Sequence, residues 1–215
     1  MDEQPLTGLV TGPNLFSYIG APLQQDHDDI ADCNNIATGS ADLGYHRYAD
    51  PKGWFEEYVR TLNFLGWSLY HDSIYTTTQH MVSGSVADFL VESAQGMRDS
   101  SQANAMIDTL DTLKTSEAAM LSLDTQPREG ESFQIVPARY DSRGNLVIAL
   151  YKLELSVSTR KHGFLFWEWT KNSASITQRK AYLKLDRNEL DKRRALIRKK
   201  LDTHVMRRFA LRKNA

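Results

Sequence analysis

The residue types that most often perform chemistry are concentrated in one short acidic segment. Residues 26–29 are Asp-His-Asp-Asp, and Asp32 and Cys33 follow soon after. Hard cations such as Ca²⁺ bind carboxylates, but this spacing lacks the glycine and the bidentate glutamate of an EF-hand loop. Consecutive carboxylates without such a scaffold are typical of a solvated surface. We therefore expect no metal ion and no other cofactor.

Nucleophile and phosphate-binding patterns do not favour an enzyme. Cys33 is the single cysteine, which excludes an intrachain disulfide and a cysteine-based zinc site. Its acidic neighbours disfavour the thiolate that a reactive cysteine needs. The sequence has no GxSxG elbow, no P-loop and no HExxH helix. His71 and Asp72 are adjacent, and adjacent strand residues point to opposite faces. We predict a protein without enzymatic activity.

An aromatic segment is the most unusual local feature of the chain. Five of the six residues 164–169 are large and apolar, and basic residues flank them. Tryptophan beside lysine is typical of a membrane interface, and aromatic clusters also anchor protein partners. A central strand packed on both faces is the third interpretation. The expected membrane or partner contacts are Lys161, Phe164, Phe166, Trp167, Trp169 and Lys171.

The C-terminal region predicts a basic amphipathic helix. Residues 187–213 hold 11 Lys/Arg and 3 Asp/Glu, with a narrow apolar stripe. Such a helix can lie on an anionic membrane, contact phosphates or dock on an acidic protein. Nucleic acid fits less well, because no known nucleic-acid motif accompanies the helix. The expected contact residues are Lys192, Arg193, Arg194, Arg198, Lys199, Lys200, Arg207 and Arg208.

Charge is distributed unevenly between the two halves of the chain. The net charge is −1, but residues 1–130 carry −13 and residues 131–215 carry +12. One interpretation is assembly, in which the acidic half of one copy contacts the basic half of the next. The other is that the two halves meet within one chain or are simply solvated.

Gly, Pro, Asn and Asp recur through residues 1–49, which we interpret as an irregular acidic arm. Asp50 and Pro51 then predict the start of a helix that ends at Gly66. Residues 67–82 favour a strand. Helices are predicted over 85–94, with Ser85 as cap, and over about 101–122. The polar residues 124–132 mark a boundary.

The period of the apolar residues changes to two after residue 132. Strands are predicted over 133–140, 146–158, 164–170 and 176–185, with turns at 141–145, 159–163 and 171–175. In the second strand, Lys152 and Glu154 occupy the solvent-facing positions of the alternation. Asp186 or Asn188 then caps a helix that extends to about Arg212.

These elements predict an α+β fold with a helical N-terminal layer, a four-stranded antiparallel meander and a long C-terminal amphipathic helix. The expected segments are an arm over 1–49, a helical region with one strand over 50–123, and the meander with its basic helix over 133–215. Residues 50–215 are expected to form one domain.

The preferred function is a non-catalytic, self-assembling interaction protein that uses the acidic arm and the basic helix. Its partner would be a second copy or an acidic protein surface. The first alternative is a toxin-like pore former that inserts the aromatic hairpin 145–170 into an anionic membrane. The second is a nucleic-acid-binding module. MDEQPLTGLV does not resemble a Sec signal, so we expect a cytoplasmic protein or export without a leader.

Overall fold

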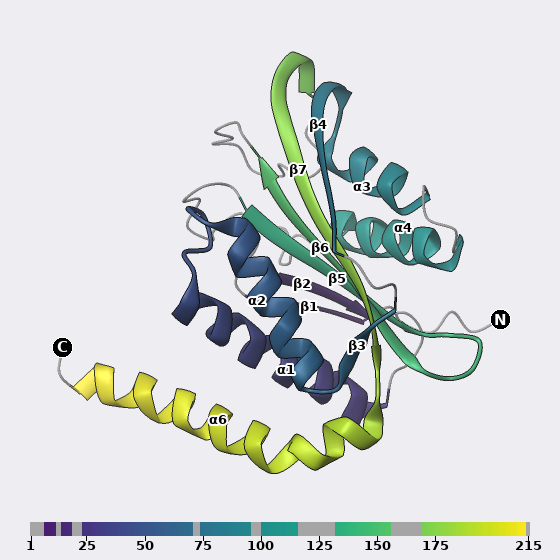
Figure 1. The fold of residues 1–215 in the computed structure, drawn as a ribbon. Helices are drawn as coiled ribbons and strands as arrows, with labels where there is room; N and C mark the ends of the chain where they lie inside the picture. The colour runs from purple at the N-terminus through teal and green to yellow at the C-terminus, as the bar shows by residue number, and fades with distance from the viewer. Residues whose placement is uncertain are drawn as a thin grey trace. The chain divides into compact units, whose positions relative to one another are not determined.

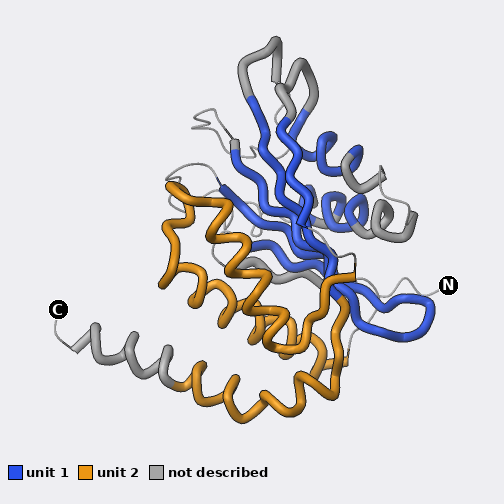
Figure 2. The backbone as a smooth tube through the Cα atoms, in the orientation of Figure 1, with its two compact units in different colours: residues 1–22, 71–183 blue, residues 23–70, 184–215 orange. Residues whose placement is uncertain are grey.

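The computed structural model describes residues 7–11, 14–18, 23–70, 74–95, 100–115, 132–155 and 169–213. Over these residues the protein is a mixed α/β fold with five helices and an open mixed sheet (Figure 1). The chain divides into two compact units, each built from segments that are distant in sequence (Figure 2). Unit 1 comprises residues 1–22 and 71–183, and unit 2 comprises residues 23–70 and 184–215.

Unit 1 is built on a sheet with the strand order β1-β2-β5-β6-β7, and β4 also pairs with β7. β2 lies parallel to β5, with Phe16 opposite Val136, whereas β5 and β6 are antiparallel, with Ile135 opposite Tyr151. β1 pairs antiparallel with β2, and β4 pairs antiparallel with β7. The strands are β1 (Thr7–Thr11), β2 (Asn14–Tyr18), β4 (Tyr75–Gly84), β5 (Ser132–Tyr140), β6 (Leu146–Leu155) and β7 (Trp169–Leu185).

Two helices, α3 (Val86–Gln95) and α4 (Ser100–Thr115), complete unit 1. Their apolar residues, such as Leu90 and Leu110, form one core with Tyr151 and Ile176 of the sheet. Ser85 and Asp88 exchange side-chain and backbone hydrogen bonds at the start of α3. This reciprocal cap satisfies amide groups that a helix leaves unpaired, and it confirms the predicted helix start.

Unit 2 contains α1 (Gln24–Gly44), α2 (Pro51–Phe64), the short strand β3 (Trp67–Leu69) and α6 (Arg187–Lys213). The Asp50 side chain accepts a hydrogen bond from the backbone amide of Gly53, which confirms the predicted start of α2. After α2, Gly66 adopts a φ of 105°, a conformation that favours glycine. Ser68 Oγ then donates to the carbonyl oxygen of Lys184, where β7 enters this unit.

The helices α1 and α2 pack through buried aromatic and polar groups. Tyr58 on α2 donates to the side-chain oxygen of Asn34, whose amide group bonds to the carbonyl of Ile30 one turn earlier. Trp54 Nε1 donates to Asp42 Oδ1 at 2.7 Å. Arg47 also bonds Asp42, with its guanidinium 4.7 Å from the centre of the Trp54 ring. Asp42 is thus held by two donors.

Several predictions about the elements are wrong. Residues 24–44 form the helix α1 and not part of an irregular arm, because its packed face includes polar residues that hide the helical period. Residues 171–175 are not a turn, because β7 continues through them while Ala174 and Ser175 pair with β4. The sheet is mixed and not purely antiparallel, because β2 and β5 run parallel.

Other local predictions are confirmed. The turn after β5 contains Gly144 with a φ of 76°, the left-handed conformation expected for that glycine. Asp141 accepts hydrogen bonds from the backbone amides of Arg143 and Asn145, which closes this turn. Most of the predicted strand 164–170 lies outside the described residues.

Candidate functional site

The start of α6 is fixed by the turn that follows α2. The backbone amide of Asp186 donates to the carbonyl oxygen of Gly66 at 2.8 Å. The Asp186 side chain accepts from the amide of Glu189, so it caps the first turn as predicted. A Cβ atom on Gly66 would lie 2.8 Å from the backbone nitrogen of Leu190. The missing side chain at residue 66 therefore allows the turn to lie directly against α6.

One face of α6 is bound to α1 by two ion pairs. Arg187 forms a two-point hydrogen-bonded pair with Asp26, whose side chain is fully buried. Two turns further on, Arg194 Nη1 and Nη2 bond the two carboxylate oxygens of Asp29 at 2.6 and 3.0 Å. Two-point guanidinium–carboxylate pairs are strong and directional. The inward face of α6 is therefore used for folding.

Most of the charge asymmetry disappears when charges are counted by unit. The segments of unit 2 come from both halves of the chain and hold 15 Lys/Arg and 12 Asp/Glu. The asymmetry of −13 and +12 between the halves thus becomes −4 and +3 between the units. Acidic α1 and basic α6 meet within one chain, which is the second of the two interpretations offered for the charge pattern.

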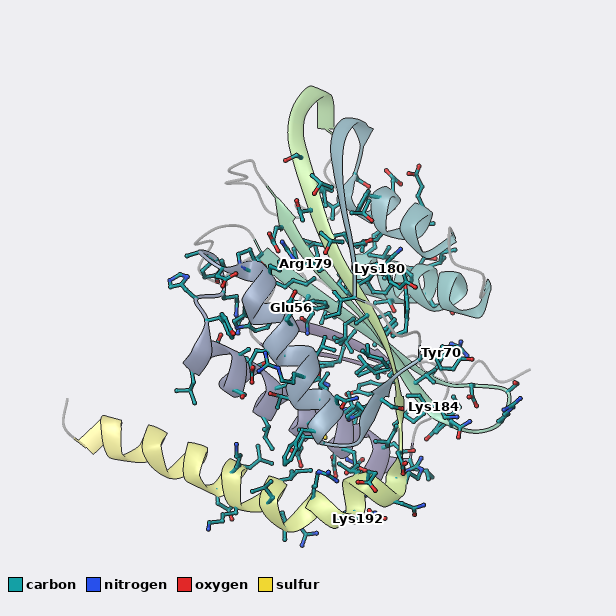
Figure 3. All side chains as sticks on the ribbon, in the orientation of Figure 1. Glu56, Tyr70, Arg179, Lys180, Lys184 and Lys192 are labelled. Atoms are coloured by element: carbon teal, nitrogen blue, oxygen red, sulfur yellow. The ribbon has the colours of Figure 1, made fainter. Side chains whose placement is uncertain are left out.

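The opposite face of α6 remains exposed (Figure 3). Lys192 Nζ and Arg193 Nη1 bond Glu189 at 2.5 and 2.8 Å, and these hydrogen bonds hold the pKa of Glu189 below its ordinary value. Further along, Arg198, Lys199 and Lys200 are all exposed. Arg198 and Lys200 form no ion pair within the described part of the chain. We call the exposed residues Lys192, Leu196, Lys199 and Lys200 the outward face of α6. Arg198 is exposed too, but it lies one turn after Arg194, at the edge of the packed face.

The predicted contact residues are therefore divided between different environments. Arg194 belongs to the packed face, and Arg198 is exposed at the edge of that face, whereas Lys192, Lys199 and Lys200 belong to the outward face. Arg207 and Arg208 lie within α6, but their side chains are outside the described set, as are those of Trp169 and Lys171 in β7. Lys161, Phe164, Phe166 and Trp167 also lie outside the described residues.

The acidic segment 26–33 is a packing element in this structure. Asp26 and Asp29 are bound to arginines, as described above. Burial, followed by the charges of Asp28 and Asp29, raises the pKa of Asp32. Burial also raises the pKa of the Cys33 thiol to about 12. The thiol therefore stays protonated, which disfavours the thiolate that a reactive cysteine needs. Within the described ranges, no group of three metal-ligating residues converges.

Sequence analysis missed a buried polar cluster in unit 1. Lys152 was expected to face solvent, but it is only 2% exposed, and its Nζ donates to Ser132 Oγ at 2.9 Å. Glu154, two residues along the same strand, bonds Arg179 of β7. Figure 3 places Arg179 and Lys180 on opposite sides of β7. Burial raises the pKa of Glu154, while the positive charges of Arg179 and Lys152 oppose this rise. Strand alternation alone does not reveal that both faces are covered.

No helix in the described part of the chain has the length and apolar character needed to cross a membrane. A scan against protein-family models finds no match, and a search of curated proteins finds none either.

Solved structures give two distant similarities to the mixed α/β fold. The first is a delta-endotoxin that is 14% identical, with a TM-score of 0.47, and the match covers 86% of this chain and 88% of that one. The second is the Evf virulence factor, which is 8% identical with a TM-score of 0.34, over 87% of this chain and 74% of that one. Similarities of this size do not define a function.

Proposed function

We propose that this is a non-catalytic interaction protein that binds an anionic surface through the outward face of α6. The observation that supports this proposal is that the basic residues of α6 fall into two sets, one bound to α1 and one exposed. Arg187 and Arg194 are bound to buried carboxylates of α1, whereas Lys192, Lys199 and Lys200 on the other side of the helix are exposed to solvent. The contacts with α1 require only the first set of basic residues. We therefore propose that the exposed set binds a partner.

The sequence of α6 continues this character towards its C-terminal end. Residues 203–213 contain four Lys/Arg and no Asp/Glu. We propose that the amphipathic pattern extends along the whole helix and enlarges the basic surface. Exposed charges of one sign attract an oppositely charged partner over about a Debye length, roughly 8 Å at physiological salt. Binding should therefore weaken as salt is added.

Assembly through α1 is less well supported than binding to another molecule. Asp26 and Asp29 already bond α6 of the same chain, so they are occupied before a second copy arrives. Exchange of α6 between copies would have to break both pairs first. We therefore place the partner's negative charges on a different molecule.

A binding panel tests the proposal. The full chain is offered vesicles of phosphatidylcholine with phosphatidylserine, polyglutamate, and double-stranded DNA, over a range of salt concentrations. We expect salt-sensitive binding to at least one of these anionic probes, and loss of that binding in the double variant Lys192→Glu/Lys200→Glu.

The matched control is Lys52→Glu/Arg60→Glu on α2, which changes the net charge equally at two exposed positions. This control should bind like the unmodified chain. The proposal is wrong if none of the three probes is bound near 0.1 M salt, or if both double variants lose binding to the same extent.

A further inference from the structure

An exposed aromatic ring lies beside the basic residues of α6. Phe64, the last residue of α2, is 54% exposed. The guanidinium of Arg193 lies 4.9 Å from the centre of its ring, a cation–π contact between two elements of unit 2. The Phe64 ring is therefore exposed to solvent and held next to α6 by its contact with Arg193.

A second apolar side chain continues this feature along α6. Leu196 is 37% exposed and lies three residues after Arg193 and four before the exposed Lys200. Residues three or four apart are neighbours on one helix face. Arg193, Leu196 and Lys200 therefore form a row, with Phe64 beside its first member. We call Phe64, Arg193, Leu196 and Lys200 the Phe64–Lys200 surface.

We propose that the Phe64–Lys200 surface docks on an anionic phospholipid bilayer. This inference rests on the proposed function, and it names the partner of the same helix. Phe64 and Leu196 would enter the boundary between headgroups and acyl chains, while Arg193 and Lys200 remain at the level of the phosphates. The neighbouring outward-face residues Lys192 and Lys199 would add long-range attraction to anionic headgroups.

The shape and composition of the surface favour lipid over a protein partner. Helical peptides are usually bound in an apolar groove, and extended peptides at a sheet edge. The Phe64–Lys200 surface instead consists of a helix end and the outer side of another helix. Its apolar side chains are interspersed with long cationic ones, the arrangement of helices that lie in the membrane interface. A bilayer can adapt to such a surface without a matching groove.

Vesicle flotation tests the inference with the full chain. The probes are vesicles of phosphatidylcholine alone and vesicles that also contain phosphatidylserine. We expect binding to the second kind, and at least a tenfold loss of affinity in Phe64→Ser/Leu196→Ser because two apolar side chains no longer enter the bilayer. Lys192→Glu/Lys200→Glu should lose about 25-fold or more, since each basic residue near such a membrane contributes about fivefold.

The control variant for the apolar residues is Leu43→Ser/Tyr70→Ser, which removes two exposed apolar side chains elsewhere in unit 2. It should float like the unmodified chain, and both serine variants should melt at the same temperature as that chain. Soluble glycerophosphoserine should not compete, because the proposal requires a lipid surface and not a single phosphate group. Effective competition, or equal loss in both serine variants, would overturn the inference.

Polyglutamate separates failure of the inference from failure of the proposed function. If Phe64→Ser/Leu196→Ser binds both polyglutamate and vesicles as the unmodified chain does, the lipid inference is wrong while charge-driven binding by α6 stands. If Lys192→Glu/Lys200→Glu binds every probe normally, the proposed function itself is wrong.

Discussion

The buried carboxylates of α1 show how individual residues define unit 2. An ionised carboxylate is costly to bury unless a cation and further hydrogen bonds compensate for the lost water. Asp26 is 0% exposed and has the two-point bond to Arg187, and Asp29 has the equivalent bond to Arg194. These aspartates therefore require α6, and their acidity is not evidence of a free acidic arm.

Substitution of Asp26 tests this requirement. We expect Asp26→Asn to lower the free energy of unfolding by about 1–3 kcal/mol, because it removes the fully buried carboxylate of a pair whose arginine is partly exposed. Asp28→Asn, at an exposed position on the same helix, should change it by less than about 0.5 kcal/mol. Urea unfolding of both variants at neutral pH provides the measurement. Equal effects would show that the Asp26–Arg187 pair does not stabilise the fold.

Substitution of Asp32 should stabilise the folded chain, whereas substitution of Asp26 should destabilise it. The size of the Asp32 effect should depend on pH. The pKa of Asp32 is raised from 3.8 in the folded chain, so the folded state holds this proton more tightly than the unfolded state does. Stability linked to Asp32 therefore falls as pH rises from 3.8 through the raised pKa. Asp32→Asn should unfold at a higher temperature than the unmodified chain at pH 7.5, and the difference should shrink towards pH 4. A constant difference across this range would contradict the assignment.

At the scale of elements, the positions with local signals were predictable. Asp50 with Pro51, Ser85 and Gly144 each act through the backbone of their immediate neighbours, so the sequence around them suffices. The helix α1 was missed because Asp26, Asp29 and Asn34 interrupt its apolar period on the packed side. Their partners Arg187, Arg194 and Tyr58 are distant in sequence and cannot be inferred from the pattern near α1.

The same distinction applies to the strands and the candidate site. Residues 171–175 have turn-forming composition, yet pairing with β4 keeps them in β7. The basic character of α6 was visible in the sequence. Its division into a packed face and an outward face was not, because that depends on where α1 lies. Phe64 was predicted as part of a helix, and its contact with Arg193 required the structure.

The contact between the turn after α2 and α6 can be tested with two glycines. Gly66→Ala should lower the free energy of unfolding by roughly 2–4 kcal/mol, because alanine disfavours its positive φ and the new Cβ would lie 2.8 Å from the backbone of Leu190. Gly144→Ala also has a positive φ but open space around it, so it should cost only about 1 kcal/mol. Equal losses in thermal or urea unfolding would show that the approach of α6 is not close.

For the whole molecule, the division into units predicts where stability depends on α6. A chain that ends at Leu185 lacks the partners of Asp26 and Asp29, whereas a chain that ends at Asp202 keeps both. We expect amide hydrogen exchange to become faster in α1 and α2 of the shorter chain, and to stay slow in β5 and β6. The longer chain should match the full protein in all four elements. Fast exchange in β5 and β6 of the shorter chain would contradict independent stabilisation of the units.

The two ion pairs of α6 also constrain biosynthesis. They join residues that are 161 and 165 positions apart, so α1 leaves the ribosome long before the residues that neutralise it. During translation its aspartates must stay hydrated while all of the intervening sheet is made. Unit 2 therefore cannot be completed during early synthesis, and its folding must follow emergence of the basic helix. Closure of such distant contacts is entropically slow, which makes the newly made α1 a segment for chaperones to protect.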